Sequence, residues 1–149
     1  MKRGVLLVAL ALVAGCAQKP PNATPEGAVR ELADRLRRTS IDPSAAKGAY
    51  ELLAKATQAN LNERAERYAA ASGKHIPPES MIAPSSFLER FEAHELHAEI
   101  VGSHALVHAQ GLLPEEIADV PCVYEDGGWR IEITLPNLPP VSVSPRSLQ

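Results

Sequence analysis

The sequence predicts an α+β domain with two or three N-terminal helices packed on a curled four-stranded antiparallel sheet. Three observations lead to this prediction. Apolar residues recur at helical spacing over residues 24–73. From His94 onward the spacing shortens to two, as in strands that bury one face. Two short turn sequences, Gly102-Ser103 and Asp126-Gly127, divide this second half into hairpins.

A segment with the layout of a secretory signal precedes the domain. Lys2 and Arg3 give a positive start, and the ten residues Val5–Ala14 form an unbroken run of Val, Leu and Ala. Ten residues rise about 15 Å as a helix, roughly half the hydrocarbon thickness of a bilayer. The segment is therefore too short to stay as a membrane span, and we expect residues 1–15 to be removed.

The end of this segment, Val13-Ala14-Gly15-Cys16, resembles the lipobox of bacterial lipoprotein signal peptides. The resemblance implies cleavage between Gly15 and Cys16, a diacylglyceryl group on the Cys16 sulfur, and acylation of the freed amine. Two or three acyl chains give lasting attachment to a lipid bilayer, whereas one gives only marginal binding. The alternative is an ordinary secretory signal with an incidental cysteine. Ala17 favours the outer over the inner membrane, because Asp at that position often marks inner-membrane retention.

Charge and cysteine content limit the functions that this chain can have. The chain has a net charge of −3, and removal of Lys2 and Arg3 with the signal leaves −5, so no basic surface points to nucleic acid. With Cys16 acylated, Cys122 has no partner for an internal disulfide, and we expect it to act as a small buried apolar residue. No motif implies a cofactor.

The helical half begins after a Pro-bearing tether, residues 16–23, which should form helix or sheet only with difficulty. Thr24-Pro25-Glu26 is a helix start, and Asp42-Pro43 repeats that signal for a second helix. Asn60 with Glu63 resembles a capping box for a third helix, ended by Gly73, although the second and third could be one bent helix. The inward-facing residues would be Val29, Leu32, Ala33 and Leu36 in the first helix, and Leu61, Ala65, Tyr68 and Ala69 in the third.

A Pro-rich loop over residues 76–84 links the two halves, with one helical turn expected from Pro78. Apolar residues in and after this loop are expected to pack on the core. They are Met81, Ile82, Phe87, Leu88 and Phe91.

The turn positions fix the expected strand pairing. Across Gly102-Ser103, Ile100 should face Ala105, Ala98 should face Val107, and His97 should lie opposite His108. Residues 112–119 should form a connection, and a third strand, Val120–Tyr124, should pair with a fourth, Trp129–Leu135. The expected pairs are Tyr124 with Trp129, Cys122 with Ile131, and Val120 with Ile133. Pro121 should place its end of the strand at an edge. Residues 136–149 hold four prolines and should be extended and partly disordered.

Three stretches together are similar to the nuclear-transport-factor-two-like superfamily. They are Thr24-Pro25-Glu26, Gly102–Val107, and Glu125-Asp126-Gly127-Gly128-Trp129-Arg130-Ile131. The resemblance covers residues 24–135 and implies a cone whose open end can hold a small molecule. Enzymes of that family place Asp, His or Tyr in the cone. None of those motifs matches this chain position by position, so no catalytic residue is assigned.

The candidate chemistry lies on one strand face. His97, Glu99, His104 and His108 share it in the expected register, and His97 with His108 would form a two-histidine metal clamp. The alternative is a mostly polar, solvated outer face. Tyr50 and Tyr68 are either packed in the core or acids in a cavity. The basic run Arg35, Arg37 and Arg38 is either solvated or in contact with lipid headgroups.

These observations favour a non-catalytic, envelope-anchored lipoprotein that binds or assembles with an unknown envelope protein or small ligand. One alternative is an enzyme or small-molecule binder that uses the cone. The other is a metal-binding strand face at His97 and His108.

Overall fold

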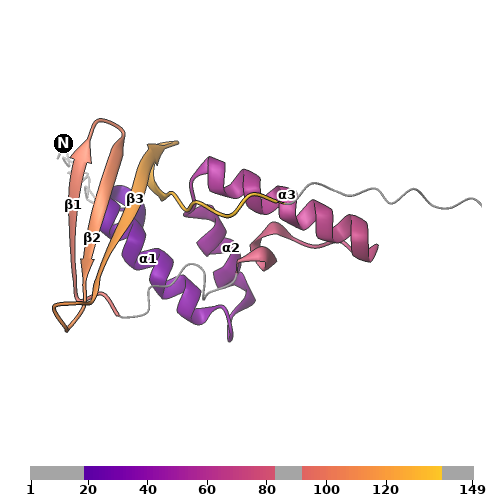
Figure 1. Ribbon diagram of the computed structural model, residues 1–149, viewed down its shortest axis with the longest axis horizontal. Helices are drawn as coiled ribbons and strands as arrows, with labels where there is room; N and C mark the ends of the chain where they lie inside the picture. The colour runs from indigo at the N-terminus through magenta and orange to yellow at the C-terminus, as the bar shows by residue number, and fades with distance from the viewer. Residues whose placement is uncertain (1–18, 83–91, 139–149) are drawn as a thin grey trace, which may run out of the picture.

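The computed structural model describes residues 19–82 and 92–138. Three helices come first, and a four-stranded antiparallel sheet packs against them (Figure 1). The signal segment with Cys16, the apolar residues Phe87, Leu88 and Phe91, and residues 139–149 lie outside the described ranges. The elements are η1 (Pro21–Ala23), α1 (Pro25–Arg38), α2 (Pro43–Glu51), α3 (Lys55–Ser72), η2 (Pro78–Met81), β1 (Glu95–Val101), β2 (His104–Gln110), β3 (Ile117–Glu125) and β4 (Gly128–Ile131).

The first helix begins as predicted. The Thr24 hydroxyl accepts a hydrogen bond from the Gly27 amide at 3.1 Å, and Pro25 occupies the first helical position. Leu32 and Leu36 are buried as expected. The tether differs from the expectation, because its last residues form the 3₁₀ turn η1 and pack against α1.

Two separate helices follow, so the single bent helix is wrong. Asp42 caps α2, as predicted. The chain then leaves helical geometry at Leu53, which forms a bridge with Ile131 of β4. The Ile131 amide donates to Leu52 and the Ala54 amide donates to the Ile131 carbonyl, at 2.9 and 2.8 Å. The last strand thus determines where α2 ends.

The predicted start of α3, with Asn60 as its N-cap, is six residues too late, because the N-cap is Ala54. The helix begins at Lys55, whose amide donates to the Glu125 carboxylate at 3.0 Å. This cap comes from the end of β3, 70 positions away along the chain, so no local sequence signal could reveal it. Asn60, the expected cap, lies inside the helix and accepts from the Arg64 side chain.

The other end of α3 is as predicted, because Gly73 adopts a left-handed conformation with φ of 67° and ends the helix. Leu61 and Ala65 are buried. Tyr68 is 61% exposed, so its predicted inward position is wrong. Tyr68 lies toward the free end of the helix, which extends away from the sheet (Figure 1).

The predicted pairing of β1 with β2 is confirmed at every position. His97 lies opposite His108, Ala98 opposite Val107, and Ile100 opposite Ala105. Gly102 has a φ of 62°, which a two-residue hairpin turn with glycine in its first position requires.

Strand β3 is longer than predicted, because residues 117–119 of the expected connection already pair with β2. It is an interior strand in the order β1-β2-β3-β4. Its pairing with β4 covers only Cys122–Glu125, so Pro121 stands where the ladder with β4 stops. Proline, which has no amide hydrogen, is tolerated at such a local edge.

Strand β4 is shorter than predicted. The pairs Tyr124–Trp129 and Cys122–Ile131 are confirmed, but the strand ends at Ile131 and the pair Val120–Ile133 is wrong. Ile133 instead bonds to Thr57 of α3, which draws the chain off the sheet. Beyond it, the Pro136 carbonyl accepts a hydrogen bond from Arg64.

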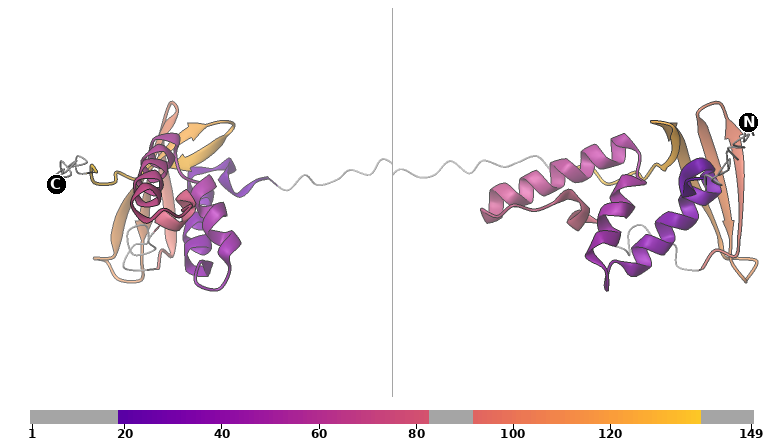
Figure 2. Two further views of the ribbon diagram at one scale, coloured as in Figure 1. Left: turned by 90° about the vertical axis from the view of Figure 1, so that its right-hand side faces the viewer. Right: turned by 180° about the vertical axis from the view of Figure 1, so that it is seen from behind.

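All three helices lie on one side of the sheet (Figure 2). Helix α1 contacts β1, β2 and β4. The core between these layers is formed by Leu32, Leu36, Leu53, Val107, Cys122, Trp129 and Ile131. The sheet is open and not strongly curled, so the predicted cone shape is wrong. In a closed cone the two edge strands would approach each other. Here β1 and β4 are the edge strands of an open sheet and do not pair.

The side chain of Glu26 in α1 protects the free edge of β1. The Glu26 carboxylate accepts a hydrogen bond from the Ala98 amide at 3.1 Å. In the register of this hairpin, the Ala98 amide points away from β2, toward the free edge. Glu26 therefore occupies a position that an added strand would use.

Candidate functional site

The residues expected to carry a lipid, Gly15 and Cys16, lie outside the described part of the chain. No helix within the described ranges is long and apolar enough to cross a bilayer. The described chain starts at Lys19 and enters the domain through η1, which packs on α1 and β4.

The histidine face of the sheet exists in the predicted register. His97 and His108 are directly opposed, with Glu99 and His104 on the same face. Asp119 joins this group from β3, opposite His108. Sequence reasoning missed Asp119 because residues 112–119 were expected to be a connection rather than part of a strand.

The strongest contact on this face links His108 to Asp119. The His108 Nδ1 atom lies 2.6 Å from the Asp119 carboxylate, and its Nε2 atom lies 3.7 Å from Glu99. The hydrogen bond to Asp119 raises the pKa of His108, with smaller contributions from the charges of Asp119 and Glu99 and against a desolvation cost. This side chain is therefore a proton-binding group held between two acids.

The metal clamp lacks a complete set of ligands. Within residues 19–82 and 92–138, no three His, Cys, Asp or Glu side chains come together as a metal site requires. Metal binding by His97 and His108 stays a prediction. A zinc-dependent rise in melting temperature that His108→Ala abolishes would support it.

The candidate cavity residues have other contacts. The Tyr50 hydroxyl donates to the Asn62 side chain at 3.0 Å, and Tyr68 is exposed. Cys122 is 1% exposed, as expected for a buried apolar residue, and its thiol lies 3.7 Å from the Val120 carbonyl. Burial, with the charges of Glu26 and Glu132, raises the pKa of Cys122 to about 12. A thiol with that pKa is protonated at neutral pH and is a poor nucleophile.

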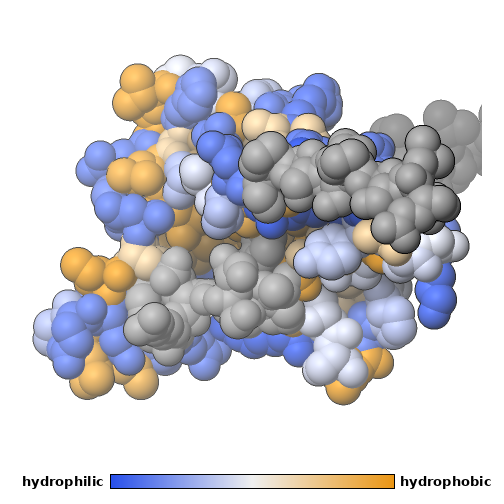
Figure 3. All heavy atoms as spheres, turned by 45° about the vertical axis from the view of Figure 1, so that its right-hand side comes forward, coloured by the Kyte–Doolittle hydropathy of each residue, from blue (hydrophilic) through white to orange (hydrophobic). Residues whose placement is uncertain are grey.

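An open hollow lies where β1 begins and β2 ends. Its volume is about 560 Å³, and His94, Glu95, Gln110, Gly111, Leu112 and Pro114 line it. Three apolar side chains lie in the adjoining connection and strand start: Leu112 is 77% exposed, Leu113 51% and Ile117 67%. Figure 3 shows exposed apolar groups at the upper and lower ends of the sheet side of the molecule. We call Leu112, Leu113 and Ile117, with the hollow, the distal patch.

Sequence reasoning missed the distal patch, although one signal was present. Leu112-Leu113 is a pair of large apolar residues in an expected surface connection. Where no strand or helix would bury it, such a pair indicates an exposed apolar surface.

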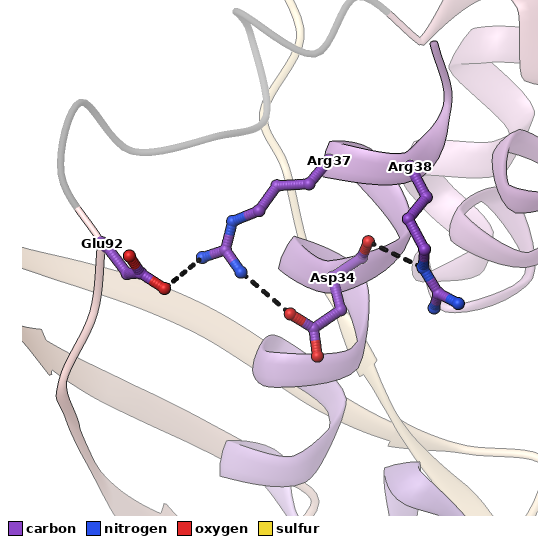
Figure 4. A network of polar contacts seen from close by, with 4 residues as sticks. All are labelled: Asp34, Arg37, Arg38 and Glu92. Atoms are coloured by element: carbon purple, nitrogen blue, oxygen red, sulfur yellow. Dashed lines mark hydrogen bonds and ion pairs between the residues drawn. The ribbon is translucent and has the colours of Figure 1, made fainter. Parts of the chain in front are cut away.

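The basic end of α1 makes local ion pairs and a side-chain hydrogen bond to the backbone. Arg37 lies 2.9 Å from the Asp34 carboxylate and 3.7 Å from Glu92, while Arg38 donates to the Asp34 carbonyl at 3.2 Å (Figure 4). The side chain of Arg37 is 44% exposed, so these contacts are solvated and contribute little stability. This end of α1 lies away from the two hairpin turns (Figure 1).

Comparison of the chain with protein-family models, with curated proteins and with solved structures found no match. Kinship with the nuclear-transport-factor-two-like superfamily therefore stays a prediction.

Proposed function

We propose that this chain is an envelope-anchored lipoprotein that serves as a non-catalytic binding or assembly module. The lipobox resemblance at Val13–Cys16 supports the anchor, and Ala17 favours the periplasmic face of the outer membrane. The acylated Cys16 would hold the protein on the bilayer, and the folded domain would present a binding surface to a partner.

The distal patch is the observation that carries the binding role. Single exposed apolar side chains are ordinary, but here three large ones lie within six residues of chain and adjoin a hollow. A few residues in well-packed, desolvated contacts supply most of the binding energy of protein interfaces, and exposed apolar side chains beside a hollow can form such a contact. The partner that fits is an envelope protein with a complementary apolar surface.

A small-molecule or enzymatic role has less support. The helix-facing side of the sheet is filled by side chains of α1 and the core, with Leu32 4% and Val107 0% exposed. The hollow is open to solvent, and its lining offers one carboxylate, one imidazole and one amide side chain. That set suits weak, solvated contact better than the enclosed sites in which small ligands are held.

Site-specific photocrosslinking in intact cells tests this proposal. A photoreactive residue at position 112 should capture a defined partner, and Leu113→Asp should abolish that product by placing a charge in the apolar contact. The same probe at Tyr68, which is also exposed, is the matched control. Capture of the same protein from both positions, or capture that survives Leu113→Asp, would contradict the proposed surface.

The anchor has its own test. Cys16→Ser should release the protein from the membrane fraction and remove the acyl mass seen by mass spectrometry. A mature wild-type chain that retains its N-terminal Met and carries no acyl group would contradict the lipoprotein assignment.

A further inference from the structure

Both hairpin turns and the entry of the chain lie at one end of the sheet (Figure 1). The Tyr124 amide donates to the Ser103 carbonyl at 2.7 Å, which sets the two hairpins side by side. Asn22 of η1 lies against Gly128, where an added Cβ would clash with the side-chain amide nitrogen of Asn22. We call the turns Gly102-Ser103 and Asp126-Gly127, with Ile100, Val101 and Tyr124 beside them, the hairpin end.

We propose that the hairpin end lies on the lipid surface, with Ile100, Val101 and Tyr124 in contact with the bilayer. This inference rests on the proposed anchor at Cys16 and goes beyond it, because it assigns an orientation and a second, non-covalent lipid contact.

The short tether supports this orientation. Pro21 is only five positions along the chain from Cys16, and an extended chain spans at most about 3.6 Å per residue. Pro21 therefore lies within about 18 Å of the acylated residue, less than the thickness of the hydrocarbon core. An anchor this close brings the hairpin end to the bilayer and leaves the distal patch at the opposite end of the sheet.

The hairpin end carries apolar side chains that are about half exposed or more. Val101 is 79% exposed, Ile100 54% and Tyr124 47%. The Tyr124 ring packs edge-on against Trp129, with ring centroids 5.4 Å apart, so the ring is held in place. Tyrosine suits the boundary between headgroups and hydrocarbon because its ring is apolar and its hydroxyl is polar.

The charge of Asp126, in the second hairpin turn, is neutralised by an ion pair. The Lys55 ammonium lies 2.9 Å from the Asp126 carboxylate, so this pair approaches the headgroups without net charge. Each partner has another charged group nearby. The Glu125 carboxylate accepts a hydrogen bond from the Lys55 amide, and Arg130 adds a positive charge near Asp126. Attraction to the bilayer would come from apolar burial and from the tether rather than from a basic surface.

A second copy of the chain fits the hairpin end less well. Stable protein interfaces bury about 800 Å² on each partner. Three side chains on two narrow turns offer much less area than that, whereas a bilayer can adapt to the protruding turns.

Depth-dependent fluorescence quenching tests the proposal on the acylated protein in vesicles of phosphatidylethanolamine and phosphatidylglycerol. An environment-sensitive dye is attached to Val101→Cys, and the matched control carries it at Leu113→Cys in the distal patch. Cys122 stays unlabelled because it is 1% exposed and has a pKa of about 12. Quenchers on the lipid chains should reduce emission severalfold at position 101 and leave position 113 unchanged.

The outcomes are separable. A protein that floats with the vesicles but shows no quenching at position 101, or equal quenching at both positions, overturns this inference and leaves the anchor intact. Intermolecular crosslinking at position 101 without lipid quenching overturns it in favour of a dimer. A protein that fails to acylate or float contradicts the proposed function itself. Ile100→Asp, with an unchanged melting temperature, should reduce quenching at position 101 and keep the protein on the vesicles.

Discussion

The hydroxyl of Thr57 makes two hydrogen bonds to the backbone of Ile133. It donates to the Ile133 carbonyl at 3.2 Å and accepts from the Ile133 amide at 3.0 Å. Thr57 is the only buried polar residue in the described core, with 2% exposure. This double contact joins α3 to the segment that follows β4 and replaces the strand pairing expected for Ile133.

Thr57→Val should destabilise the fold, because it keeps the side-chain shape but leaves the amide and carbonyl of Ile133 without their partner. An unsatisfied buried polar group costs about 1–3 kcal/mol, so we expect a loss in this range or somewhat above it. Chemical denaturation measures the free energy of unfolding. Thr57→Ser, which keeps the hydroxyl, should lose less. Equal losses for the two variants would show that the hydroxyl contributes nothing.

Glu26→Ala should weaken the protected edge of β1. The Ala98 amide loses its acceptor, and α1 loses a negative charge in its first turn, where the helix dipole favours one. We expect a loss of about 1 kcal/mol and a greater tendency to associate through β1. Denaturation and light scattering measure the two effects. Glu26→Gln keeps an acceptor oxygen and should remain monomeric; association by both variants would point to another surface.

His108 should titrate above the ordinary histidine pKa of about 6.5 because Asp119 holds its proton. The raised pKa means that the ion pair stabilises the folded state below about pH 6.5, and that this contribution is lost as the pH rises through the folded pKa. NMR titration of the imidazole protons measures the value directly. Asp119→Asn should lower it, whereas Glu99→Gln, at the longer contact, should change it less. No change with Asp119→Asn would contradict the assigned cause.

Cys122 should be unreactive in the folded protein. Full-length Cys16→Ser leaves Cys122 as the one thiol of the chain. Its pKa of about 12 and its burial predict slow modification by thiol reagents at pH 8, with a rate set by unfolding. Modification should accelerate in denaturant to the rate of a free cysteine. Fast reaction under native conditions would mean that the core opens at β3.

The sheet was largely predictable from local patterns. Alternation around Gly102-Ser103 and Asp126-Gly127 leaves one register that buries the apolar face, and both hairpins adopt it. The errors arose where a distant residue decides the outcome. Glu125 caps α3 and Thr57 ends the pairing of β4, and both partners are about 70 residues away along the chain. Flanking residues carry no trace of such contacts.

The candidate site was also predictable only in part. The opposition of His97 and His108 followed from the turn. The contact of His108 with Asp119 did not, because it depends on where β3 begins. The distal patch depends on the exposure of Leu112 and Leu113 among the described residues, and such exposure has no sequence pattern of its own.

The close approach of Asn22 to Gly128 has a mechanical consequence. A pulling force applied at the N-terminus enters the body at η1, where the first described turn packs on the last strand. The load is then shared by α1 and β4 instead of peeling one terminal segment away. A larger side chain at position 128 would separate these two segments, and the molecule should then yield at a smaller force.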